Sequence, residues 1–364
     1  MRTMRAAVLA SAGSPLQIID GVTIDAPRDN EVLVRISHCG VCHSDLSIVD
    51  GTMPYPTPAI LGHEAAGTIV ETGAKVVGRS VGDRVALSMR PPCGDCYWCA
   101  RNEPVLCIQT ATPLGGGDTR LYLQGNPVAR GFRLGAFAEY ALVEVSGVIP
   151  VPQQIPLQSA AIMGCAIQTG LGSVMNIARV EAGATAVVFG LGGVGLSVIQ
   201  GLLLAEAGKI IGIDPIQSRR SKAEEIGAHV TFDSRATDLQ NKVLAATNGI
   251  GADYAFDTVA TTATTASGIE MLRRGGKLVL IGVSGAPEPL GVTSMDLVMR
   301  QKSILGSFLG NCHAQRDLTR YFDLCCSDRL SLAALVTACR PLTEINEAME
   351  DLRRGIGVRT VLTI

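Results

Sequence analysis

Short apolar runs separated by glycine and proline fill the first part of the chain. Residues 32–36, 65–72 and 83–87 are rich in β-branched residues and are bounded by turn-forming residues. A first strand is expected at residues 6–10, where residues 11–15 then interrupt the pattern. Runs of this length and composition predict short strands, which we expect to form an irregular β-barrel domain.

From residue 167 to residue 308 the pattern changes to apolar runs that alternate with helical segments. Residues 185–189 form a continuous β-rich run, residues 194–207 follow as a predicted helix, and residues 209–213 form the next strand. Further strands are expected at residues 229–232, 254–256, 277–281 and 303–308. This alternation predicts an α/β fold with a parallel sheet wound on both faces, as in the Rossmann fold.

The tail has a helical stretch near residues 318–324 and a β-like end at residues 358–364. A chain of 364 residues suits about two domains. We expect one domain to contain residues 1–166 and 309–364, and the other to contain residues 167–308.

Composition narrows the possible partners. The net charge of −2 and the pI near 6.2 argue against nucleic acid, because phosphate binding needs a basic surface. No apolar run is long enough to span a membrane, and residues 6–10 are too short for the core of a signal peptide. We therefore expect a cytoplasmic protein that acts on a small molecule.

Four of the eleven cysteines, Cys93, Cys96, Cys99 and Cys107, lie in one short segment. Four thiolates bind zinc tetrahedrally in closed, structural sites, and Gly94 permits a tight turn between the first two. Buried or redox-active cysteines are the alternative. Without an export signal, metal binding is favoured over disulfides.

A second set of possible metal ligands is dispersed: Cys42, His63 and Cys165. Two thiolates and one imidazole would leave zinc with one open position, where it acts as a Lewis acid. Taken singly, each residue can equally be a buried cysteine or a hydrogen-bonded histidine of the core.

The sequence Gly-Leu-Gly-Gly-Val-Gly at residues 190–195 follows a predicted strand and opens a predicted helix. In this context the motif predicts a dinucleotide site with the pyrophosphate at the helix N-terminus. Asp214 ends the next strand, where a carboxylate binds ribose hydroxyls and repels a 2′-phosphate. NAD is therefore favoured over NADP, although Arg219 and Arg220 nearby weaken this preference.

Together these motifs resemble the zinc-containing medium-chain alcohol dehydrogenases over essentially the whole chain. The resemblance is carried by Gly-Val-Cys42-His-Ser-Asp, Gly62-His63-Glu64, the four-cysteine segment, Gly164-Cys165-x3-Thr169-Gly170 and residues 190–195. Residues 117–120, running on to residues 137–140, look like the longer loop of the dimeric branch. The resemblance implies a homodimer, with a homotetramer as the alternative.

The resemblance also implies a GroES-like catalytic domain, two zinc ions per subunit and reversible oxidation of an alcohol with NAD. Catalytic zinc would be bound by Cys42, His63 and Cys165, with Glu64 behind the metal, Asp45 holding the imidazole and Ser44 accepting the hydroxyl proton. The implied cofactor contacts are His43 and Arg359 at the pyrophosphate, Asp214 and Arg219 at the ribose, Thr169, Val194 and Val283 near the nicotinamide, and the glycines Gly190, Gly192, Gly193 and Gly195.

At two positions this sequence has a different residue from many members of the family. Ser47 stands where they have the histidine that ends a proton relay, so we expect the proton to pass from Ser44 through the ribose hydroxyl to solvent. His43 stands where they have arginine, and an imidazole holds pyrophosphate less firmly than a guanidinium. We expect cofactor affinity to weaken as pH rises through the titration of that imidazole.

The resemblance places an apolar wall around the substrate, made by Met53, Met89, Leu106, Phe137, Val283 and Phe308. Any one of them can instead be plain core packing. This wall favours medium-sized hydrophobic alcohols, aliphatic or benzylic. Enzymes that oxidise glutathione adducts usually carry an arginine early in the long loop, and residues 108–116 contain none.

Three alternatives are less consistent with the motifs. Polyol dehydrogenases commonly have glutamate where Cys165 stands, and zinc-free quinone or enoyl reductases lack the four-cysteine segment. The third alternative is a non-catalytic NAD-binding protein with structural zinc only. It is disfavoured because the complete catalytic ligand set is present.

Overall fold

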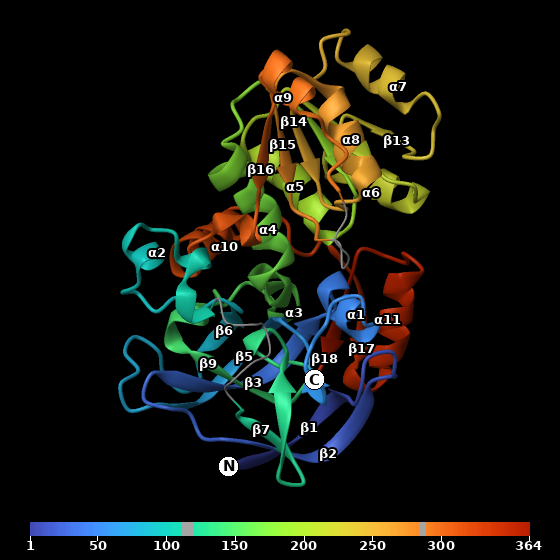
Figure 1. Ribbon diagram of the computed structural model, residues 1–364. Helices are drawn as coiled ribbons and strands as arrows, with labels where there is room; N and C mark the ends of the chain where they lie inside the picture. Colours follow the sequence, from blue (N-terminus) through green and yellow to red (C-terminus); the bar gives the residue numbers. More distant parts are fainter. Residues whose placement is uncertain (111–118, 284–288) are drawn as a thin grey trace. The chain divides into compact units, whose positions relative to one another are not determined.

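The computed structural model describes residues 1–110, 119–283 and 289–364, in two compact units (Figure 1). The first unit comprises Met1–Cys165 and His313–Ile364, and the second comprises Ala166–Cys312. Residues 117 and 118 of the expected long loop, together with residues 111–116, lie outside the described residues.

A closed barrel forms one part of the first unit. Its strands, in barrel order, are β1 (Arg2–Leu9), β2 (Gln17–Ile24), β7 (Leu121–Leu123), β8 (Asn126–Arg130) and β4 (Ala59–Ile60). The second half of β1, from Ala6 to Leu9, is buried, together with Val22 and Ile24 of β2. The predicted irregular β-barrel is therefore confirmed.

The second sheet of this unit joins the tail of the chain to its early part. Its strands are β10 (Val148–Pro150), β6 (Arg84–Leu87), β5 (Glu64–Thr72), β3 (Glu31–Gly40), β18 (Arg359–Thr363) and β17 (Val336–Pro341), with β9 (Tyr140–Glu144) also paired to β3. Val361 of β18 lies opposite Gly40 of β3 in antiparallel register. The final strand therefore lies next to the segment that leads into Cys42.

Short helices connect these strands. The α-helices of the first unit are α1 (His43–Val49), α2 (Tyr97–Ala100), α3 (Leu157–Ala160), α10 (Thr319–Cys326) and α11 (Ile345–Arg353). Its 3₁₀-helices are η1 (Pro104–Leu106), η2 (Ile108–Thr110), η3 (Gly131–Arg133), η4 (Val145–Gly147), η5 (Ala161–Gly164) and η9 (Leu342–Glu344). The segment η8 (Ala314–Leu318) is a π-helix.

A six-stranded parallel sheet forms the second unit. Its spatial order is β13 (Val230–Phe232), β12 (Lys209–Ile213), β11 (Thr185–Phe189), β14 (Ala252–Asp257), β15 (Leu272–Leu280) and β16 (Ser303–Gly306). Numbered within this unit, the order is 3-2-1-4-5-6, which is the doubly wound order of Rossmann domains. The predicted α/β fold is confirmed.

Helices cover both faces of this sheet. The α-helices of this unit are α4 (Ala166–Gly172), α5 (Gly193–Leu204), α6 (Gln217–Ile226), α7 (Leu239–Ala246), α8 (Thr262–Met271) and α9 (Ser294–Arg300). It also contains the π-helix η6 (Ser173–Ala178) and the 3₁₀-helix η7 (Leu309–Asn311). Val243 of α7 and Met271 of α8 pack with Val187 and Ile211 in one buried cluster. Gly195 of α5 lies beside Val188, whose side chain points to the opposite face.

Several boundaries differ from the predicted ones. The strand expected at residues 277–281 is the end of the longer β15, and the helix expected at residues 194–207 begins at Gly193 and ends at Leu204. Helix α11 was not predicted, although Ile345, Ala348 and Met349 are buried at helical spacing.

No single helix in the described part of the chain is long and apolar enough to cross a membrane. The consecutive helices Leu157–Gly164 and Ala166–Ala178 reach that length and apolarity only when taken together.

Candidate metal and dinucleotide sites

Four potential ligands meet in the first unit. One donor atom from each of Cys42, His63, Glu64 and Cys165 lies within 4.8 Å of all the others, and all four residues are buried. Cys42 caps the N-terminus of α1, His63 precedes β5, and Cys165 follows η5. The fold therefore brings together the three dispersed ligands expected from the sequence, with Glu64 beside them.

Asp45 orients this cluster. Its Oδ1 atom lies 3.2 Å from Nδ1 of His63 and accepts the Gly62 N–H at 3.0 Å, while Oδ2 accepts the Cys42 N–H at 3.3 Å. The Nε2 atom of His63 is buried and has no hydrogen-bond partner. Buried polar atoms are nearly always satisfied, so an unpaired imidazole nitrogen beside two thiols indicates a metal ligand.

Glycines allow the close approaches that build the cluster. A Cβ atom on Gly40 would lie 2.3 Å from Oε2 of Glu64, and one on Gly164 would lie 2.1 Å from the carbonyl oxygen of Leu87. Gly62 has a φ of +90° and would place its Cβ 2.6 Å from the Phe137 nitrogen. A side chain at any of these positions would displace the ligands that it adjoins.

The charges inside the cluster favour a bound cation. The Cys42 thiol has a pKa well below its usual value because the Cys165 thiol donates to it and Arg359 adds positive charge, although burial opposes this. For His63, burial lowers the pKa of the imidazole, but the charge and hydrogen bond of Asp45 outweigh the effect of burial and raise this pKa. Thiolate character at Cys42 is what a soft metal requires.

Glu64 and Arg359 form a buried pair behind the ligands. The Nε atom of Arg359 lies 3.4 Å from Oε2 of Glu64, and its Nη1 donates to the Val41 carbonyl at 2.8 Å. Burial raises the pKa of Glu64 to about 7, while the positive charge of Arg359 works against this rise. In this arrangement Arg359, which we expected at the cofactor pyrophosphate, compensates the charge of Glu64.

Ser44, which we expected to take the substrate proton, lies in the first turn of α1, as does His43, which we expected at the pyrophosphate. The Oγ atom of Ser44 lies 3.8 Å from Sγ of Cys42 and is half-buried, so a hydroxyl group stands next to the ligand cluster. His43 is exposed. The carbonyl of Ser47 accepts the Met53 N–H at 3.0 Å, which closes the end of the helix.

Phe132 is a neighbour of the cluster that the sequence did not reveal. Its ring centroid lies 4.3 Å from that of His63. The hydroxyl of Tyr55 accepts the Phe132 N–H at 3.0 Å and donates to the Arg130 carbonyl at 3.1 Å. Phe132 also has a φ of +48°, an uncommon conformation that these contacts help to hold. No local motif marks this support.

The second ligand cluster is formed by the four cysteines around α2. Their sulfur atoms lie within 4.8 Å of one another, with Cys93 and Cys107 at 3.5 Å and Cys96 and Cys107 at 3.9 Å. All eleven cysteines lie among the described residues, and none of them forms a disulfide. Gly94 has a φ of +92°, so the turn between Cys93 and Cys96 has the left-handed backbone that glycine favours.

The glycine motif forms the turn between β11 and α5. Gly190 has a φ of +81°, and a Cβ on Gly195 would lie 1.8 Å from the carbonyl oxygen of Gly190. A Cβ on Gly192 would meet no atom within 4 Å, which leaves open space at this turn, and no side chain caps the helix that begins at Gly193. The turn therefore offers backbone N–H groups to an anion, and Val194 is half-buried beside them.

Asp214 ties this turn to the next strand. Its Oδ2 atom accepts the Leu191 N–H at 2.8 Å, and Oδ1 accepts the Ile216 N–H at 2.8 Å. Asp214 is buried, and Arg219 is half-buried. Thr169 is buried on α4 of the same unit.

The residues expected along the substrate wall differ in exposure. Phe137 is fully buried, and Met89 is also buried, so both are part of the core of the first unit. Met53 is half-buried, whereas Leu106 is exposed. Val283 and Phe308 are exposed on the second unit.

Comparisons with known proteins identify the family to which the chain is similar. The family model "Alcohol dehydrogenase GroES-like domain" matches residues 28–153, and "Zinc-binding dehydrogenase" matches residues 193–326. The NDMA-dependent alcohol dehydrogenase of Amycolatopsis methanolica is 36% identical, covering 98% of this chain and 98% of that protein. An S-(hydroxymethyl)glutathione dehydrogenase of Photobacterium damsela subsp. piscicida is 33% identical, covering 98% and 99%. The crystal structure of benzyl alcohol dehydrogenase from Acinetobacter calcoaceticus superimposes with a TM-score of 0.93 at 29% identity, covering 100% of both chains.

Proposed function

This chain belongs to the zinc-containing medium-chain alcohol dehydrogenase family, and we propose that it oxidises a medium-sized hydrophobic alcohol, aliphatic or benzylic, with NAD. It is an oxidoreductase, and the reaction is reversible between the alcohol and an aldehyde or ketone. The observation that carries the proposal is that the donor atoms of Cys42, His63 and Cys165 lie close together in a buried site, where Nε2 of His63 has no hydrogen-bond partner.

These donors fit a catalytic zinc. Two thiols and one imidazole nitrogen make up a Cys2His set, which is the known ligand set of zinc in alcohol dehydrogenases. Zinc bound there supplies a Lewis acid that lowers the pKa of an alcohol hydroxyl. The four cysteines around α2 fit a second, structural zinc, so we propose two zinc ions per subunit.

The side chains around the metal ligands have separate tasks. Asp45 accepts a hydrogen bond from Nδ1–H of His63, which leaves Nε2 as the ligand atom. Ser44 takes the hydroxyl proton of the substrate and passes it toward the cofactor ribose and solvent. Glu64 and Arg359 compensate each other's charge behind the ligands.

The second unit holds the cofactor in this proposal. The N–H groups at the start of α5 bind the pyrophosphate. Asp214 and Arg219 bind the adenosine ribose. Thr169, Val194 and Val283 position the nicotinamide.

Two relatives guide the choice of substrate. The similarity to a benzyl alcohol dehydrogenase supports a hydrophobic alcohol. The similarity to an S-(hydroxymethyl)glutathione dehydrogenase makes a glutathione adduct the competing candidate. We favour the hydrophobic alcohol because residues 108–116 lack an arginine that could pair with glutathione carboxylates.

The test is the formation of reduced nicotinamide by the purified protein with NAD and a panel of alcohols. The panel contains short and long aliphatic, benzylic, secondary cyclic and polyol substrates and S-(hydroxymethyl)glutathione, with NADP in parallel. Separate reactions contain NDMA, because one relative is named for its dependence on it. We expect NAD-dependent turnover of benzylic or longer aliphatic alcohols that is lost on chelation.

A cysteine substitution provides the matched comparison. Cys165→Ser is expected to abolish turnover, whereas Cys326→Ser, at an exposed cysteine of α10, is expected to leave it intact. Preference for the glutathione adduct would replace the proposed substrate class. Zinc-loaded protein that binds NAD but oxidises no panel member would contradict the proposed activity.

We also propose that the protein is a homodimer, with a homotetramer as the alternative. This proposal rests on the resemblance of residues 117–120 to the long loop of the dimeric branch. Light scattering coupled to size-exclusion chromatography measures the mass directly, and a tetramer mass would contradict the proposal.

A further inference from the structure

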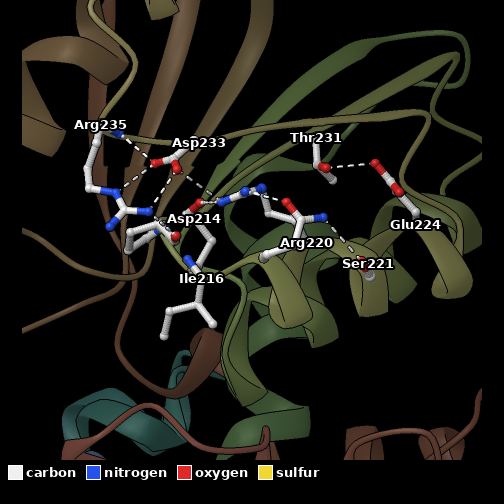
Figure 2. Close-up of polar contacts among 10 residues, drawn as sticks. Asp214, Ile216, Arg220, Ser221, Glu224, Thr231, Asp233 and Arg235 are labelled. Carbon is white, nitrogen blue, oxygen red and sulfur yellow. Dashed lines mark hydrogen bonds and ion pairs between the residues drawn. The ribbon is translucent and has the colours of Figure 1, made fainter.

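Two aspartates occupy equivalent positions at one edge of the parallel sheet. Ile213 of β12 lies opposite Phe232 of β13, so Asp214 and Asp233 each directly follow the paired ends of neighbouring strands. Figure 2 shows Asp233 between two arginines, Arg220 and Arg235. Asp214 is the proposed ribose-binding residue, and Asp233 so far has no role.

Asp233 pairs with both arginines at once. Arg235 forms a bidentate pair with the Asp233 carboxylate: it donates through Nη2 to Oδ2 at 2.8 Å and through Nε to Oδ1 at 3.0 Å. The Nη1 atom of Arg220 lies 3.6 Å from the same Oδ2 atom. The side-chain hydrogen bonds from Arg235 hold the pKa of Asp233 well below its usual value, so the carboxylate is charged throughout the neutral range.

Backbone contacts hold both guanidinium groups beside Asp214. Arg220 donates through Nη1 to the Asp214 carbonyl at 2.7 Å, and Arg235 donates through Nη2 to the Pro215 carbonyl at 2.8 Å. The Arg220 side chain is only 11% exposed, whereas that of Arg235 is 72% exposed. Two fixed positive charges therefore stand where the ribose of a bound dinucleotide would carry its 2′ substituent.

Arginine at this place normally favours a 2′-phosphate, because its planar donors match phosphate oxygens. Here the charges of Arg220 and Arg235 are balanced by those of Asp214 and Asp233, and Asp233 occupies the donors of Arg235. A phosphate would have to displace the Asp233 carboxylate and would meet its repulsion.

We propose that Asp233 is a specificity-determining residue for the cofactor, which keeps Arg220 and Arg235 in ion pairs and thereby excludes the 2′-phosphate of NADP. The inference rests on the proposed function, in which the adenosine ribose lies at Asp214. It assigns the exclusion of NADP to two carboxylates rather than to Asp214 alone.

The experiment measures equilibrium binding of NADH and NADPH by their fluorescence, without turnover. Asn at position 233 can still accept the Arg235 backbone N–H that Oδ1 of Asp233 accepts at 2.9 Å. In Asp233→Asn we expect the dissociation constant of NADPH to fall about tenfold or more, while that of NADH changes less than about threefold. Asp233→Ser serves as a second variant if Asp233→Asn does not fold.

Matched variants separate the proposed role from a general change in charge. Asp238→Asn removes the same charge from an exposed ion pair with Lys242, whose atoms lie 2.9 Å apart, and is expected to leave both constants unchanged. Asp233→Glu is expected to keep the preference for NADH. Adding Arg220→Gln and Arg235→Gln to Asp233→Asn is expected to abolish the gain in NADPH affinity.

The outcomes distinguish this inference from the proposed function. Folded Asp233→Asn that binds NADPH no more tightly than wild type overturns the inference, as does a gain that survives loss of both arginines. Wild type that binds NADPH as tightly as NADH also overturns it. Failure of the wild-type protein to bind NADH at all would overturn the proposed function and this inference together.

Discussion

The Nδ1 atom of His63 lies 3.2 Å from Oδ1 of Asp45, and both side chains are fully buried. The same carboxylate accepts the backbone N–H groups of Gly62 and Cys42. One side chain therefore fixes the ring of one proposed metal ligand and the backbone that carries another. Its loss should affect the metal site more than the fold.

Asp45→Asn is expected to weaken zinc binding at the catalytic site about 10- to 100-fold, as is usual for loss of a carboxylate behind a ligating histidine. The measurement is competition with a zinc chelator of known affinity. Asp50→Asn, at the exposed C-terminal end of α1, is the control and should retain wild-type affinity. Equal zinc affinity in both variants would remove the orienting role of Asp45.

Cys96→Ser is expected to lower the zinc content from about two ions per chain to about one, because a structural site needs all four thiolates. The melting temperature should fall as well, since metal binding contributes directly to folding stability. Metal analysis and thermal denaturation give the two values, and Cys339→Ser at an exposed cysteine is the control. Unchanged zinc content would contradict a zinc site in this segment.

Ser44→Ala is expected to lower kcat about 10²- to 10⁴-fold with little change in KM, because it removes the group that takes the substrate proton. Steady-state kinetics on the best alcohol measure both constants. Ser331→Ala, at an exposed serine outside both ligand clusters, should leave them unchanged. A rise in KM with kcat unchanged would indicate that Ser44 only contacts substrate.

Ser47→His is expected to alter the pH dependence of kcat by adding a titratable group next to the proton path. The structure places Ser47 one helical turn after Ser44 and leaves it half-buried, so a larger side chain can reach solvent. The measurement is the pH–rate profile of the variant against wild type. Identical profiles would argue against a relay role at this position.

Tyr55→Phe tests the support behind Phe132. Burial raises the pKa of Tyr55 to about 12, whereas an unfolded tyrosine titrates at about 10. A pKa raised by folding gives a stabilisation that is complete below pH 10 and is lost as pH rises toward 12. The variant should be less stable than wild type by about 1 kcal/mol at pH 8, and this gap should narrow above pH 10.

Urea denaturation at several pH values measures that gap. Tyr97→Phe, at an exposed tyrosine, is the control and should show no such convergence. A constant difference between Tyr55→Phe and wild type from pH 8 to pH 11.5 would contradict a buried, protonated hydroxyl.

Local motifs could be predicted from the sequence, whereas contacts between distant segments could not. The four cysteines and the glycines from Gly190 to Gly195 act within single turns, so their spacing determines their geometry. Cys42, His63 and Cys165 are far apart in sequence, and only the resemblance to a known family indicated that they meet.

The neighbours of these sites were missed for physical reasons. Phe132 contacts His63 through an unusual backbone conformation that no residue pattern signals. Asp233 meets Arg220 only because β13 pairs with β12 in one particular register. Helix α11, by contrast, has buried residues at helical spacing and was open to prediction.

The antiparallel pairing of β18 with β3 also sets the order in which the protein can be completed during synthesis. Arg359, which compensates Glu64, and the carbonyl of Thr360, which accepts the Val41 N–H at 3.0 Å, come from the end of the chain. Residues 1–165 therefore cannot complete their unit until the whole of the second unit has been translated. The thiols of Cys42 and Cys165 therefore lack their neighbouring strand until β18 has been translated and has left the ribosome.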